Sequence, residues 1–250
     1  MKKILLTTVG VILGLGVARV SALGPNDGGC AGKKSGATAG GGCGKPCHDG
    51  AGGAPTENPA VQAVLASLPT MKYRVGDQTV CCANGASVMA KTESKPIEYV
   101  VGDDVFAAEA EAKAKLAALY ESEIENLTAL QFSVGGESTR CPETAKGMAE
   151  KSKATIAYKV GGVEFADKAK AEATVKLVTD AAAAVKMSYK VDDKPFCCDK
   201  MAGMAAKDSG KPIVYIVGEE EASDELAAKL MYAQAKIRAI VQTAASARSS

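Results

Sequence analysis

A tyrosine or phenylalanine followed two residues later by valine recurs six times along this 250-residue chain. The motifs are Tyr73/Val75, Tyr99/Val101, Phe132/Val134, Tyr158/Val160, Tyr189/Val191 and Tyr215/Val217. Successive aromatics lie 26, 33, 26, 31 and 26 residues apart, so the larger unit is a pair of motifs with a period of 59 and then 57 residues. Internal repetition constrains the architecture before any other signal is weighed.

Each motif predicts a tight β-hairpin. The third and fourth residues after the aromatic are glycine, aspartate or glutamate, as in Gly76-Asp77 and Gly135-Gly136. Two-residue hairpin turns require positive φ, which glycine and aspartate tolerate. With such a turn the seventh residue lies opposite the aromatic: Val80, Phe106, Thr139, Phe165, Phe196 or Ala222. Strand alternation then gives the aromatic, the valine and this partner one buried face, with Thr139 and Ala222 as weaker copies.

After each hairpin the apolar period changes from two to about 3.6, which indicates a helix. The second hairpin of each pair is followed by a long helix, and the first by a shorter one such as 83–92 or 199–207. The predicted fold is therefore α+β: three tandem repeats of about 57–59 residues, each ββα(short)-ββα(long), with antiparallel hairpins packed against helices. We expect each pair to form one small sheet covered on one face by its two helices, and neighbouring repeats to pack together because each is small. The strand order is left open.

Residues 1–22 are predicted to be a secretory signal peptide. Lys2-Lys3 forms a positive region, 4–18 an apolar region, and Val20-Ser21-Ala22 a cleavage site of small residues. The alternative is a membrane anchor, but the apolar run is shorter than the roughly 20 residues that a spanning helix needs. We therefore expect a periplasmic or secreted, extracytoplasmic protein after cleavage near Ala22, with no membrane insertion once the signal is removed.

The remaining chain divides by composition. Residues 23–57 are predicted to be a flexible, glycine-rich linker that contains cysteines. Asn58-Pro59 is a helix cap followed by proline at the first helical position, so order resumes there. The three repeats are placed at 58–129, 130–186 and 187–250.

The charge balance argues against nucleic acid as a partner. The chain has 30 basic residues, of which Lys2, Lys3 and Arg19 lie in the signal segment, against 29 acidic residues and no tryptophan. A protein so near neutrality, without aromatic stacking platforms, lacks the basic surface that nucleic-acid binding requires.

Cysteine occurs at one fixed offset in the repeats. It lies nine residues after the aromatic in the first motif of each pair, at Cys82, Cys141 and Cys198. A second cysteine precedes two of these, at Cys81 and Cys197. All lie where a hairpin becomes a helix, and a helix N-terminus stabilises a thiolate. The position is therefore suited to a metal ligand or a reactive sulfur.

Strand alternation predicts that Cys82 follows Val80 toward the core while Cys81 faces away. For the three equivalent cysteines, packing or a structural disulfide is preferred to metal binding. For Cys81 and Cys197 the two interpretations are balanced. The nearby methionines are interpreted as core residues, with thioether ligation of copper(I) as the alternative; they are Met89, Met148, Met201 and Met204.

The segment from Tyr189 to Cys198, and more loosely that from Tyr73 to Cys82, resembles the YHS and TRASH group of small metal-associated modules, in which a hairpin ending in Phe-Cys leads into a helix. The resemblance implies heavy-metal binding or sensing, with Cys82, Cys141 and Cys198 as the matching sulfur positions. Those modules usually place another cysteine a few residues on, where this chain has Gly85, Thr144 and Met201.

The linker holds a second group of candidate ligands: Cys30, Cys43, Cys47 and His48. Three thiols and an imidazole are an acceptable tetrahedral set for zinc. The alternatives are covalent haem attachment, for which the spacing between Cys43 and Cys47 is one residue too long, and a stalk whose cysteines form disulfides.

Catalytic constellations are missing, because His48 is the sole histidine and the glycine pairs lie inside hairpins. We therefore expect an exported, non-catalytic repeat protein that binds soft or heavy metal ions, zinc or copper, through the repeat cysteines, with the linker group as a second site. The alternative is a disulfide-stabilised extracytoplasmic scaffold without metal, whose partner is an envelope protein.

Overall fold

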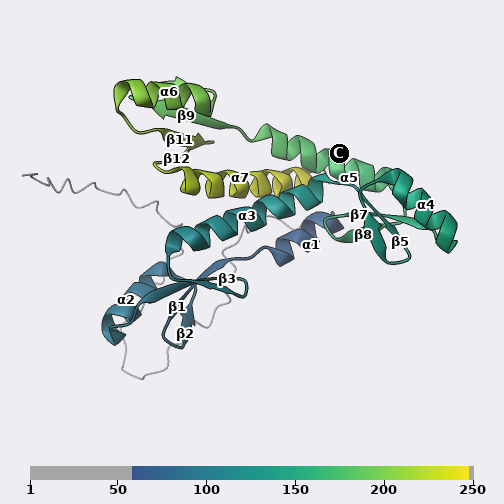
Figure 1. The fold of residues 1–250 in the computed structure, drawn as a ribbon, viewed down its shortest axis with the longest axis horizontal. Helices are drawn as coiled ribbons and strands as arrows, with labels where there is room; N and C mark the ends of the chain where they lie inside the picture. Colours follow the sequence, from purple (N-terminus) through teal and green to yellow (C-terminus); the bar gives the residue numbers. More distant parts are fainter. Residues whose placement is uncertain (1–57, 248–250) are drawn as a thin grey trace, which may run out of the picture. The chain divides into compact units, whose positions relative to one another are not determined.

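The computed structural model describes residues 58–247 (Figure 1), so the predicted signal peptide and linker lie outside the described residues. The first described element is helix α1 (Pro59–Ser67). The side chain of Asn58 accepts hydrogen bonds from the backbone N–H groups of Ala60 and Val61, at 3.1 and 3.2 Å. The cap predicted from Asn58-Pro59 is confirmed.

Three successive sets of elements follow α1. The first is β1 (Met71–Val75), β2 (Gln78–Val80), α2 (Ala83–Glu93), β3 (Ile97–Val101), β4 (Asp104–Phe106) and α3 (Glu109–Thr128). The second is β5 (Gln131–Val134), β6 (Glu137–Thr139), α4 (Pro142–Ser152), β7 (Ile156–Val160), β8 (Val163–Phe165) and α5 (Lys168–Ala184). The third is β9 (Met187–Val191), β10 (Lys194–Phe196), α6 (Asp199–Ser209), β11 (Val214–Val217), β12 (Glu220–Ala222) and α7 (Glu225–Ser246). The predicted α+β class and the alternation of short and long helices are confirmed.

Each repeat forms its own four-stranded antiparallel sheet, in which the two hairpins join through their first strands. The strand order is β2-β1-β3-β4 in the first repeat, and the other two follow the same pattern. Tyr73 lies opposite Tyr99 at this junction, with ring centroids 5.8 Å apart in an edge-to-face arrangement. The same contact recurs between Phe132 and Tyr158 and between Tyr189 and Tyr215, so the repeated aromatics join hairpin to hairpin.

The hairpin register follows the sequence prediction in all six cases. Tyr73 pairs with Val80 at one end of the chain and Tyr215 with Ala222 at the other. The turns use positive φ, as at Gly76 with φ 58°. All six motif valines are at most 4 % exposed. The aromatics themselves are only half-buried, so the valines form the innermost part of each sheet's covered face.

The long helices carry the packing between repeats. Helices α3, α5 and α7 contact one another, and α1 packs beside α3. One core cluster contains Val101 and Leu127 of the first repeat, Val160 and Val178 of the second, and Ile240 of α7. A second, smaller cluster beneath the third sheet includes Val217 and Met231. The expectation that neighbouring repeats pack together is confirmed.

Gly161, in the turn between β7 and β8, fits closely against the first repeat. Its backbone N–H donates to the carbonyl of Asn126, at 3.2 Å. A Cβ at this position would lie 2.7 Å from Leu127 Cδ2 and 3.3 Å from the carbonyl oxygen of Ala60. Glycine is therefore needed both for its φ of 55° and for the close approach of two repeats.

Candidate functional site

The three equivalent cysteines are the N-cap residues of the short helices. Cys82, Cys141 and Cys198 all have extended backbones at these positions. The backbone carbonyl of each accepts the first helical N–H, from Ala86, Ala145 and Ala202 respectively. Each of these alanines is completely buried against its own sheet. The start of each short helix is thus held by a backbone hydrogen bond and a small core residue. The surroundings of the cysteine sulfur can therefore differ from one repeat to the next.

The predicted directions of the first cysteine pair are wrong. Cys82 is exposed, whereas Cys81 is only half-exposed. Strand β2 ends at Val80, and the chain bends at Cys81, so strand alternation no longer applies there. In the third repeat the expectation holds, because Cys197 is exposed and Cys198 is half-buried.

The described cysteines also differ in whether they form a disulfide. Cys81 is disulfide-bonded. Cys82, Cys141, Cys197 and Cys198 are free thiols, so the partner of Cys81 is not among them. None of the three equivalent cysteines is in a disulfide in the described part of the chain, and Cys82 and Cys141 are exposed.

Hydrogen bonding lowers the pKa of the Cys141 thiol. The largest contribution comes from the side chain of Thr144, followed by the backbone N–H groups of Thr144 and Glu143 in the first turn of α4. The backbone N–H of Cys141 donates in turn to the hydroxyl oxygen of Thr139, at 3.2 Å. This cysteine thus has the thiolate stabilisation expected at a helix N-terminus.

Four sulfur-containing residues of the third repeat lie in or just before the first two turns of α6. Cys197 and Cys198 are adjacent free thiols. Met201 lies in the first turn and Met204 in the second, and they are 52 % and 54 % exposed. The interpretation of the methionines as core residues is wrong for these two, whereas Met89 and Met148 are half-buried.

Within residues 58–247, no group of three or more histidine, cysteine, aspartate or glutamate side chains is arranged to hold a metal ion. Cys82, Cys141 and Cys198 start three different short helices, each packed against a separate sheet. The linker candidates Cys30, Cys43, Cys47 and His48 lie outside the described residues. A metal site in the described part would therefore have few ligands, drawn from one repeat.

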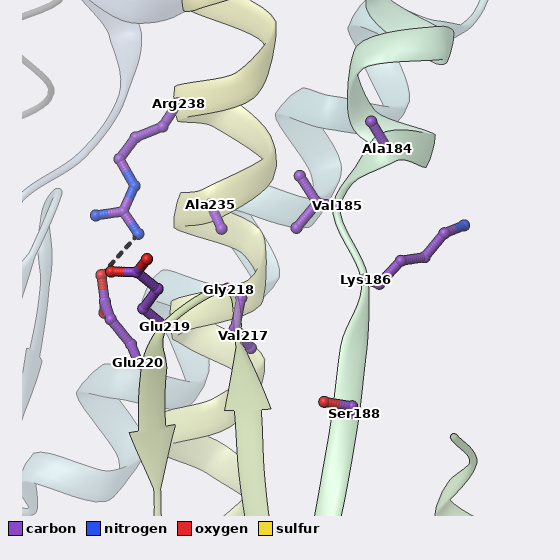
Figure 2. Close-up of a pocket in the computed structure, with 10 residues that line it drawn as sticks. All are labelled: Ala184, Val185, Lys186, Ser188, Val217, Gly218, Glu219, Glu220, Ala235 and Arg238. Atoms are coloured by element: carbon purple, nitrogen blue, oxygen red, sulfur yellow. Dashed lines mark hydrogen bonds and ion pairs between the residues drawn. The ribbon is translucent and has the colours of Figure 1, made fainter. Parts of the chain in front are cut away.

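A pocket of about 680 Å³, here called the third-repeat pocket, lies where the end of the second repeat meets the third and was not predicted. Figure 2 shows it between α7, the β11–β12 turn and the segment that follows α5. An alignment of the repeats indicates this pocket. Ala184 and Ala235 occupy positions at which the first repeat has Leu68 and Leu119.

Comparison with known proteins adds no family. No protein-family model, curated protein or solved structure matches this chain. Among the described residues, no helix is long and apolar enough to cross a membrane.

Proposed function

We propose that this protein is an exported, non-catalytic repeat protein that binds soft metal ions, with Cys197 and Cys198 as its principal ligands. The observation that carries the proposal is the pairing of two adjacent free thiols with two exposed methionines at the start of α6. Export is supported by the signal-like pattern of residues 1–22.

The chemistry of these ligands favours copper(I). Thiolate and thioether sulfurs are soft donors that select copper(I) over harder cations. Cys198 is the N-cap of α6, and Met201 lies three residues later. The side chain of an N-cap residue and that of the residue three places later lie close together, as in a capping box, so their sulfurs can approach a common ion. Copper(I) accepts few ligands, and two thiolates with one thioether are a sufficient set.

The other two repeats lack parts of this arrangement. Gly85 and Thr144 replace Met201 at the equivalent positions. Arg140 stands where a second thiol would be in the middle repeat, and Cys81 is already disulfide-bonded in the first. We therefore assign the strongest binding to the third repeat, with Cys82 and Cys141 as single, secondary thiols.

The test is a competition between the purified protein and a chromophoric copper(I) chelator under anaerobic conditions. We expect one tightly held copper(I) that is lost in the Cys197→Ser/Cys198→Ser variant. Met201→Leu, which keeps size but removes the thioether, should weaken binding by about tenfold, the effect of about 1.4 kcal/mol.

The matched control is Cys82→Ser/Cys141→Ser, which removes the same number of thiols and should leave the tight copper(I) in place. Retention of copper(I) in Cys197→Ser/Cys198→Ser would contradict the proposal. If that copper is then lost on replacing Cys43 and Cys47, the site belongs to the linker. A parallel titration with zinc tests whether the protein binds zinc, the other metal expected from the sequence.

A scaffold without metal is the second candidate. It is favoured by the exposed apolar residues at one equivalent position of two short helices, Val88 on α2 and Met204 on α6, 64 % and 54 % exposed. Such residues can contact an envelope protein. Absence of stoichiometric copper or zinc in every preparation, after mild reduction, would leave this candidate standing.

A further inference from the structure

The floor of the third-repeat pocket is apolar. Val217, which is 4 % exposed, lies at the end of β11, and Ala235 lies on the facing side of α7. Ala184 and Val185 close the pocket from the end of α5. In Figure 2 the side chains of Val185 and Ala235 point toward each other, whereas Lys186 extends away. An apolar floor with polar groups around it, and a volume of about 680 Å³, are found in sites for small ligands.

The pocket arises from two small residues at positions that are large in the sister repeats. Ala184 corresponds to Leu68 and Leu127, and Ala235 corresponds to Leu119 and Val178. All four larger residues belong to, or pack against, the main core cluster. The third repeat therefore keeps the backbone of this site but lacks the branched aliphatic side chains that fill it elsewhere.

The charged groups of the pocket lie at its rim and balance. Arg238 donates to the Glu220 carboxylate at 3.1 Å, and both side chains remain about half-exposed (Figure 2). The carbonyl of Val185 accepts a hydrogen bond from the Tyr232 hydroxyl at 3.4 Å. Glu219 adds a second carboxylate to the lining and Lys186 a second cation. With two carboxylates and two cations around an apolar floor, the pocket favours a neutral ligand over a charged one.

We propose that this pocket binds a small, neutral, branched aliphatic molecule. Its apolar group lies over Val217 between Ala184 and Ala235, in the space that corresponds to the leucine side chains of the sister repeats. The Arg238–Glu220 pair stays at the rim in contact with water. This site is independent of the sulfur ligands on α6 and does not rest on metal binding.

The test uses isoamyl alcohol, whose branched end is the side chain of leucine. Proton–nitrogen NMR spectra of the purified protein are recorded during the titration. We expect saturable shifts of the Gly218, Glu219 and Ala235 amides, with a dissociation constant on the order of 1 mM. Isovalerate has the same apolar group but carries a carboxylate, and should bind about tenfold more weakly because its charge must lose water over an apolar floor.

The Ala184→Leu/Ala235→Leu variant restores the residues of the first repeat and should abolish the saturable shifts. The control Ala173→Leu/Ala183→Leu adds two leucines at exposed positions of α5 and should bind like the parent. If the pocket variant fails to fold, Ala235→Val restores only the residue of the second repeat. Non-saturating shifts in the parent, or equal binding by parent and filled variants, would overturn the proposal.

Discussion

At the scale of single residues, one helix position carries three different chemical environments. Cys82 lies beside Gly85, where a Cβ would come within 2.9 Å of its sulfur. The Cys141 thiol instead receives hydrogen bonds from Thr144. Cys198 precedes the exposed Met201. The residue three places after the N-cap therefore sets the chemistry of each thiol.

Replacing Thr144 by valine should slow the reaction of Cys141 with a thiol reagent at neutral pH by a few-fold. The hydrogen bonds stabilise the thiolate and lower its pKa, so the reactive form persists as the pH falls. Loss of the Thr144 donor should move the midpoint of the pH–rate profile of Cys141 upward. Mass spectrometric peptide mapping resolves this cysteine from the others.

The control for this measurement is Thr92→Val, which removes an exposed hydroxyl that donates to the Val88 carbonyl on α2. It should leave the Cys141 profile unchanged. A profile that is the same in Thr144→Val and in the parent would show that this hydroxyl does not stabilise the thiolate.

At the scale of elements, the hairpin turns differ in what they contact. Gly135 and Gly161 occupy equivalent turns with nearly equal positive φ, 60° and 55°. Nothing lies within 4 Å of a Cβ at Gly135, whereas a Cβ at Gly161 would meet Leu127 and α1. Replacing Gly135 therefore tests the free-energy cost of the backbone conformation alone, whereas replacing Gly161 adds the cost of overpacking the contact between repeats.

Gly135→Ala should lower the free energy of unfolding by about 1–2 kcal/mol, the cost of a left-handed conformation for an L-residue. Gly161→Ala should cost about 1–3 kcal/mol more, because the methyl group also overpacks the contact between repeats. Urea unfolding followed by circular dichroism measures both. Equal losses in the two variants would contradict the close contact at Gly161.

The hairpins were predictable because their register depends on neighbouring residues. Turn chemistry and side-chain alternation together fix the pairing of Tyr73 with Val80. The junction of Tyr73 with Tyr99 was not predictable, because it depends on which strand lies beside which. The direction of Cys82 failed because alternation was extended one residue past the end of β2.

The candidate sites were predictable to different degrees. The helix N-terminal position of the repeat cysteines followed from the change of period after each hairpin. Their separation onto three sheets depends on tertiary packing, which a single sequence does not determine. Ala184 and Ala235 become visible only when the repeats are aligned beyond the aromatic motif, along the long helices.

At the scale of the described molecule, the long helices join the repeats and the short helices pack against their own sheets. Helix α7 contacts both α3 and α5. The Asn58 side chain, which caps α1, also donates to the buried Thr174 hydroxyl on α5 at 3.3 Å. Stability should therefore be shared among repeats through these helices.

Ile240→Ala should destabilise the protein by about 2–5 kcal/mol, because this residue is 1 % exposed in the core cluster shared by the repeats. Hydrogen exchange should accelerate in the sheets of the first and second repeats as well as in α7. Met231→Ala, in the separate cluster of the third repeat, should accelerate exchange mainly there. Unchanged exchange in the first two sheets of Ile240→Ala would show that the repeats are energetically independent.

The repeat cysteines lie at the start of the short helices, away from the joining long helices, which has a consequence for how such a chain can diversify. The pair Cys81-Cys82, the single Cys141 and the pair Cys197-Cys198 occur on the same backbone. A thiol can therefore be gained, lost or doubled in one repeat without a matching change in the contacts between repeats. Three copies of one repeat can thus acquire separate chemical properties while the contacts between them stay the same.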